Sequence, residues 1–144
     1  MCYAIYRTKT KEGDFMFIEI KSDSDVPIYL QLAHQLMEGM VRGELKPGDS
    51  LPSVRAFASD LGMNMHTVNK AYHYLEEKEF IQIVAKSGVI IQPNGIPKAS
   101  EEEKHKLEAQ LRPFVTEGLV LKLSEEELVV MVRNLVQNIE EGNE

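Results

Sequence analysis

Two short amphipathic segments separated by a glycine constrain this 144-residue chain more than any other feature. Residues 54–61 carry apolar side chains at the i, i+3, i+4, i+7 spacing of a helix with one buried face. These are Val54, Phe57, Ala58 and Leu61. Ser53 can cap the free N–H groups at the start of this helix, and Gly62 can adopt the left-handed conformation that ends it. Asn64 is a good N-cap for a second helix only about three residues later, so the spacing predicts a helix-turn-helix.

The second helix sorts its residues by angle into an apolar face and a polar flank. The apolar face consists of Val68, Ala71, Tyr72 and Leu75, and the polar flank consists of His66, Asn69, Lys70 and His73. Polar side chains at a helix start, Thr67 included, can hydrogen-bond base edges and phosphates, and the helix N-terminus itself attracts phosphate. The alternative is an ordinary solvated face, and the stripe taken alone favours that alternative.

A hairpin is predicted directly behind the second helix. Residues 80–84 and 89–92 are apolar, β-branched runs separated by a short polar stretch that includes Lys86, Ser87 and Gly88. A hairpin in this place is the wing of a winged helix, and its tip can reach the DNA backbone or the minor groove. Lys86, Ser87 and Gly88 are therefore candidates for DNA contact.

Three sequence blocks resemble the GntR family of bacterial transcription regulators. They are the PIY at residues 27–29, the GELKPGDSLPSVR ending at Arg55 and the TVNKAY starting at Thr67. The similarity runs from residue 27 to about 92. It implies that the recognition helix enters the major groove and that Arg55 contacts a phosphate or a guanine. The resulting set of candidate DNA contacts is Ser53, Arg55, Asn64, His66, Thr67, Asn69, Lys70, Lys86, Ser87 and Gly88.

The chain departs from this family in two places. Many members have arginine and glycine in the wing where this chain has residues 84–87, and Glu79 replaces a glycine that is usual before the wing. The short tail is similar to the YtrA-like subgroup, in which two helices mainly serve dimerisation.

Proline and serine positions divide the remaining chain. Pro27 suits the first turn of a long helix that ends near Gly43, and residues 93–97 form a linker. Ser100 with Glu103, and Ser124 with Glu127, have capping-box spacing and predict two tail helices. Pro113 should kink the first of these helices or divide it.

The predicted fold class is α+β, mainly α, with a winged helix-turn-helix domain followed by a two-helix dimerisation tail. We assign residues 1–26 to an N-terminal extension, 27–93 to the DNA-binding domain and 94–144 to the tail. Within the extension, residues 3–10 and 15–20 could pair as a β-hairpin. A non-native extension with an authentic start at Met16 is the open alternative.

The net charge of −7 argues against a polyanionic partner until its distribution is considered. Residues 27–96 hold 6 basic and 7 acidic residues, whereas residues 97–144 hold 6 and 11. The acidic surplus therefore lies mainly in the tail, which can face away from DNA.

Other classes of function find little support. Cys2 is the single cysteine, and the histidines at 34, 66, 73 and 105 lack carboxylates at metal-ligand spacing, so neither a metal site nor a cofactor is expected. No nucleophile or phosphate-loop motif indicates an enzyme. No apolar run could span a bilayer and no secretion signal is recognised, so a cytoplasmic protein is expected.

The sequence thus predicts a sequence-specific regulator that binds a palindromic double-stranded DNA operator as a dimer. The family resemblance implies that it is a repressor, and activation is the open alternative. A winged-helix adaptor that binds protein instead of DNA is the alternative, because the positive charge is sparse. The tail offers little room for a ligand pocket, and no residue identifies a small-molecule effector.

Overall fold

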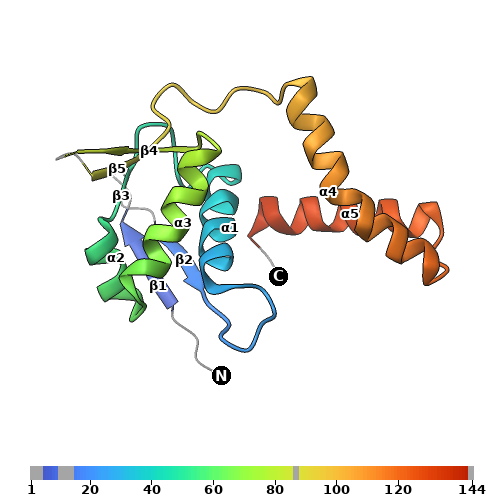
Figure 1. The fold of residues 1–144 in the computed structure, drawn as a ribbon, viewed down its shortest axis with the longest axis horizontal. Coiled ribbons are helices and arrows are strands. Elements are labelled where there is room, and N and C mark those ends of the chain that lie inside the picture. Colours follow the sequence, from blue (N-terminus) through green and yellow to red (C-terminus); the bar gives the residue numbers. More distant parts are fainter. Residues whose placement is uncertain (1–4, 10–14, 86–87, 143–144) are drawn as a thin grey trace. The chain divides into compact units, whose positions relative to one another are not determined.

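The computed structural model describes residues 5–9, 15–85 and 88–142, which form five helices and two small antiparallel sheets (Figure 1). The chain separates into two compact units, Met1–Ile96 and Pro97–Glu144. The described part is mainly helical, as the sequence predicts.

The first described residues pair as two antiparallel strands, a pairing that the sequence analysis considered possible. Strands β1 (Ile5–Lys9) and β2 (Phe15–Glu19) pair antiparallel with Ile5 opposite Glu19. The predicted ends of the first strand, at residues 3, 4 and 10, lie outside the described residues, and the second strand ends one residue before its predicted end. Ile18 and Ile20 are buried in the same core as the helices that follow, so this segment is packed into the first unit.

Helix α1 (Ile28–Val41) starts after Pro27 and buries Leu32, Ala33 and Leu36. The flanking apolar residues Ile28 and Val41 remain exposed, so only one side of this helix is buried.

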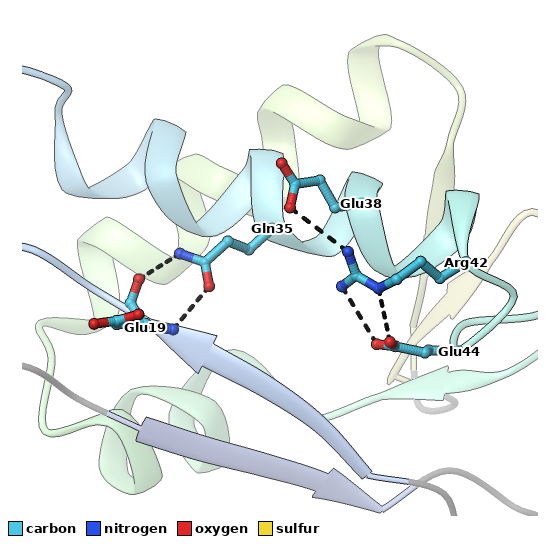
Figure 2. A network of polar contacts seen from close by, with 5 residues as sticks. All are labelled: Glu19, Gln35, Glu38, Arg42 and Glu44. Atoms are coloured by element: carbon cyan, nitrogen blue, oxygen red, sulfur yellow. Dashed lines mark hydrogen bonds and ion pairs between the residues drawn. The ribbon is translucent and has the colours of Figure 1, made fainter. Parts of the chain in front are cut away.

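Two glutamines, one helical turn apart on α1, fix the segment after β2. The Gln35 amide accepts from the Glu19 N–H and donates to the Glu19 carbonyl (Figure 2). Gln31 does the same to Lys21 at 2.9 Å in each direction. A side-chain amide has the same kinds of donor and acceptor as a peptide group. The two glutamines of α1 therefore pair with backbone groups of Glu19 and Lys21 that a neighbouring strand would otherwise pair with.

Helices α2 (Val54–Leu61) and α3 (Met65–Glu77) form the predicted helix-turn-helix. Gly62 ends α2 in the left-handed conformation with φ 64°. The core between the two helices contains the stacked rings of Phe57 and Tyr72, with centroids 6.0 Å apart. The Tyr72 hydroxyl donates to the Pro52 carbonyl at 2.7 Å, which ties α3 to the chain just before α2.

The wing is a three-stranded sheet in the order β3-β5-β4. Strands β4 (Ile81–Val84) and β5 (Gly88–Ile91) form the predicted hairpin, with Ile81 opposite Ile91. Strand β3 (Ser50–Leu51) was not predicted, because two residues are too short to show an alternating pattern. Ile81, Val89 and Ile91 are buried and close the core beneath the sheet.

The second unit contains helices α4 (Glu101–Val120) and α5 (Glu125–Glu141), and both predicted capping boxes are present. Of the two predicted effects of Pro113, division of the first helix is wrong, since α4 runs through it without interruption, and a kink stays a prediction. The missing N–H of Pro113 leaves the Ala109 carbonyl without its helical partner. Because this part of α4 is exposed, water can hydrogen-bond that carbonyl and the helix can continue.

Candidate nucleic-acid interface

The two flanks of α3 have opposite surroundings. Val68, Ala71, Tyr72 and Leu75 are each fully buried. His66, Asn69, Lys70 and His73 are exposed, and Thr67 is half-buried. The apolar contacts hold the helix against the core, so its polar flank is presented to solvent on a rigid element.

Ser53 and Asn64 cap the N-termini of α2 and α3, as the sequence predicts. Ser53 Oγ accepts from the Ala56 N–H at 3.1 Å, and Asn64 Oδ1 accepts from the His66 N–H at 2.8 Å. These acceptors are therefore engaged in capping. The Ser53 hydroxyl hydrogen and the Asn64 amide hydrogens are the donors that these residues can offer to a phosphate.

Arg55 is the second residue of α2 and is exposed. Among the residues that the structure describes, no hydrogen bond or ion pair engages its guanidinium. Arg42, by contrast, pairs with Glu44 at 2.7 Å and with Glu38 at 3.6 Å (Figure 2). Arg55 is therefore a cation available to an anionic partner, whereas Arg42 is neutralised within the fold.

Lys70 lies over an aromatic ring. Its Nζ is 4.2 Å from the centroid of the Tyr29 ring of α1, within the range of a cation–π contact. Tyr29 was not among the predicted site residues. Its position in the PIY block is the one sequence signal that could have indicated a role for Tyr29. Its contact with Lys70 could not be predicted, because the two residues lie on different helices and no local pattern relates them.

His73 belongs to the polar flank but carries an acidic neighbour. Its Nδ1 is 3.6 Å from Glu76 Oε1, and Glu76 Oε2 accepts from the Ile83 N–H of β4 at 3.2 Å. His105 has an acidic neighbour of the same kind, since its Nδ1 lies 3.6 Å from Glu108 Oε2. In both cases the acid is three residues ahead on the same helix, a spacing that brings the two side chains to one face.

The wing tip is only partly described. Lys86 and Ser87 lie outside the described residues, and Gly88 opens β5 with φ 83° opposite Val84. Glu79, where the family resemblance implies a glycine, has φ 63°, a conformation that costs energy for any residue with a Cβ. Glu76 and Glu79 line a shallow groove beside β4, so the described side of the wing is acidic.

Met65 is a candidate site residue that the sequence patterns missed. It is the first residue of α3, next to His66, and 46% of its surface is exposed. An apolar side chain at this place can contact a thymine methyl group in the major groove. The sequence patterns did not select it because it is apolar and belongs neither to the polar flank nor to the buried face of α3.

The described residues contain no cluster of three or more His, Cys, Asp or Glu side chains that could hold a metal ion. Over the same residues, no helix is long and apolar enough to cross a membrane.

A helix-turn-helix closed by a three-stranded wing, with an exposed polar flank on its second helix, defines the class of winged-helix DNA-binding proteins. Residues 28–91 match the family described as bacterial regulatory proteins, gntR family. The chain is 30% identical to the HTH-type transcriptional repressor YtrA of Bacillus subtilis, over 87% of this chain and 96% of that protein. It belongs to the GntR family, whose characterised relatives act as transcriptional regulators and not as enzymes.

Solved structures share the fold beyond the winged helix. A transcriptional antiterminator from Listeria monocytogenes aligns with a TM-score of 0.80 and 30% identity, over 87% of this chain and 93% of that one. YtrA from Sulfolobus acidocaldarius, a GntR-family transcription factor, aligns with a TM-score of 0.56 and 41% identity, over 72% and 97%. The resemblance to the YtrA-like subgroup is confirmed, including the two helices after the wing.

Proposed function

We propose that this regulator is a repressor that binds a palindromic operator as a homodimer. The first half of α3 enters the major groove of each half-site, and α2 contributes Arg55 to the adjacent backbone. The observation that carries this proposal is the rigid, exposed polar flank of α3, held by four fully buried residues on its opposite side.

The division of labour among the site residues follows from their chemistry. His66 and Asn69 are exposed near the helix start and suit hydrogen bonds to base edges. Arg55 and Lys70 suit phosphate, and Arg55 also suits a guanine because its guanidinium is a bidentate donor. Lys86, Ser87 and Gly88 remain candidates for a contact by the wing tip.

The homodimer is supported by the apolar surface of the second unit. No residue of α5 is buried, although its apolar side chains are numerous. An open groove of about 680 Å³ runs along α5, lined by Val129, Val132 and Val136 and by Val115 of α4. Two helices that bury so little of their apolar surface against each other are marginal alone, so a second copy of this tail is the partner that we propose.

A two-fold axis fixes the form of the operator. Two copies of α3 related by such an axis meet major-groove faces about 34 Å apart when the half-sites are one turn apart. An operator of this kind placed over a promoter would exclude the polymerase, which is repression by occlusion. The relative named a transcriptional repressor supports this sign of regulation.

The binding test uses the full-length protein and a DNA library. Selection of bound sequences should return an inverted repeat, and affinity for it should fall steeply with salt. Arg55→Ala and Lys70→Ala should each weaken binding and flatten the salt slope by about one. Lys98→Ala, which removes an exposed cation from the linker, is the matched control and should leave the slope unchanged. Absent or salt-insensitive binding would refute the operator model and favour the protein-binding adaptor.

The assembly test uses light scattering at micromolar concentration without DNA. Val132→Asp places a carboxylate in the groove of α5 and should yield a monomer. Val130→Asp introduces the same charge on the same helix outside the groove and should leave the dimer intact. A monomeric wild-type protein would contradict the dimer.

The groove also bears on control by a small molecule. Its volume is within the range of ligand sites, which is more space than the sequence led us to expect. We propose that a second helix fills it. An effector, if one acts, must bind the DNA-competent and incompetent arrangements with different affinity.

A further inference from the structure

A chain of aromatic and cationic side chains runs along the contact between α1 and α3. Lys70 Nζ lies 4.2 Å from the Tyr29 centroid, and the Tyr29 and Tyr74 rings meet edge to face at 6.4 Å. Lys78 Nζ lies 4.9 Å from the Tyr74 centroid, and His34 meets the same ring at 6.4 Å. At the surface of the contact between α1 and α3, the Tyr29 ring therefore lies beneath the Lys70 ammonium and the Tyr74 ring beneath the Lys78 ammonium.

We propose that Tyr29 is a positioning residue for operator binding, because its ring holds the Lys70 ammonium in place for a phosphate. The inference rests on the proposed function, in which Lys70 contacts the DNA backbone. Tyr29 lies on α1 and contacts Lys70 of α3. In this role Tyr29 does not itself contact DNA, but orients the lysine that does.

The physical reason is the freedom of the lysine side chain. A free lysine has many rotamers, and ordering it on a phosphate costs conformational entropy at the moment of binding. An ammonium attracted to the face of a ring has already lost much of that freedom. It has three N–H donors, and those directed away from the ring can still reach an anion.

Tyr29 is suited to this task by its own supports. It lies in the first turn of α1, is half-buried, and packs against the core on one side and Tyr74 on another. A ring fixed in this way can transmit the position of α1 to the polar flank of α3. The PIY block would then be part of the DNA-binding machinery as well as the start of a helix.

The binding experiment measures operator affinity against salt for matched variants of the full-length protein. Tyr29→Phe keeps the ring and should bind like the wild type. Tyr29→Leu removes the ring and should weaken binding about three- to tenfold, the effect of leaving one long side chain unordered. In a Lys70→Ala background the same Tyr29→Leu change should have no further effect. Lys78→Ala removes a cation from the other end of α3 and should weaken binding less than Lys70→Ala.

A second measurement reads the contact without DNA. In the free protein, the ring current of Tyr29 should shift the Lys70 ε-methylene proton resonances upfield. The shift should persist in Tyr29→Phe and vanish in Tyr29→Leu. If Tyr29→Leu fails to fold, Tyr29→Met replaces it, since methionine fills apolar space without a ring.

Three results would overturn the inference. Tyr29→Leu could bind as tightly as the wild type, or it could weaken binding equally with and without Lys70. Tyr29→Phe could also lose as much affinity as Tyr29→Leu, which would assign the effect to the hydroxyl. If the wild type binds no DNA while the Lys70 shift is present, the proposed function has failed and the positioning role fails with it, although the contact between Lys70 and Tyr29 is real.

Discussion

The buried hydroxyl of Tyr72 offers a sharp test of how the helix-turn-helix is held together. Tyr72→Phe removes one oxygen from a fully buried side chain and leaves its ring stacked on Phe57. The change breaks the 2.7 Å hydrogen bond to the Pro52 carbonyl, which joins α3 to the segment that leads into α2. Packing is otherwise preserved, so the measured effect reports this hydrogen bond.

The expected magnitude follows from the surroundings of the two partners. A hydrogen bond of this kind contributes about 0.5–1.5 kcal/mol net, and a buried acceptor left without a partner adds about 1–3 kcal/mol. Pro52 is only half-buried, so water can replace the hydroxyl after a small movement. We therefore expect a loss of about 1–2 kcal/mol in the free energy of unfolding, or roughly 4–8 °C in Tm for each kcal/mol.

The assay is urea unfolding followed by circular dichroism, with amide hydrogen exchange of α3 as a local measure of the first unit. Tyr29→Phe is the matched control, because it removes the same atom from a tyrosine whose hydroxyl makes no hydrogen bond within the described residues. It should cost less than about 0.5 kcal/mol, as surface changes do. Equal stabilities of the two variants would refute the reasoning, since the buried hydroxyl would then contribute nothing.

Three further predictions concern the turn before the wing, a helix cap and the exposed methionine at the start of α3. Glu79→Gly relieves the left-handed conformation at φ 63° and should stabilise the fold by about 0.5–1 kcal/mol in urea unfolding, whereas Glu77→Gly inside α3 should destabilise it by about 1 kcal/mol. The backbone hydrogen bond from Ser100 lowers the pKa of Glu103 from 4.5, so this cap stabilises α4 fully above pH 4.5 and is lost as pH falls through the lowered pKa. Glu103→Gln should reduce the acid-induced loss of helicity measured by circular dichroism, and an unchanged titration would contradict the assignment. Met65→Ala should relax base preference at one operator position by about 1 kcal/mol in a selection experiment, with overall salt dependence unaltered.

Much of the fold could be predicted from local patterns. The helix boundaries at Ser53, Gly62 and Asn64 follow from capping chemistry, which acts within three residues and is therefore visible in the sequence. The two capping boxes of the tail were predictable for the same reason. The wing hairpin follows from two apolar, β-branched runs around a short polar stretch, and the N-terminal pairing was one of two open alternatives. The described strands of each lie within a few residues of the expected spans.

Local patterns failed where a long-range contact or the solvent decides the outcome. Pro113 was expected to kink or divide the first tail helix, but α4 continues through it, since the carbonyl left without a helical partner lies on an exposed part of the helix where water can hydrogen-bond it. Strand β3 is two residues long and exists only because β5 pairs with it. The candidate DNA contacts remain predictions, although the structure exposes Arg55, His66 and Asn69 together on adjacent helices.

The sequence by itself determined the class of this protein, because capping residues, apolar spacing and the GntR-like blocks all specify one winged helix-turn-helix. Only the tertiary structure decided which side chains share a surface. The ring of Tyr29 meets Lys70 because α1 packs on α3, and the Tyr72 hydroxyl meets Pro52 because α3 packs beneath the start of α2. These pairs are far apart in the chain and obey no periodicity, so packing between elements, and not local propensity, creates them.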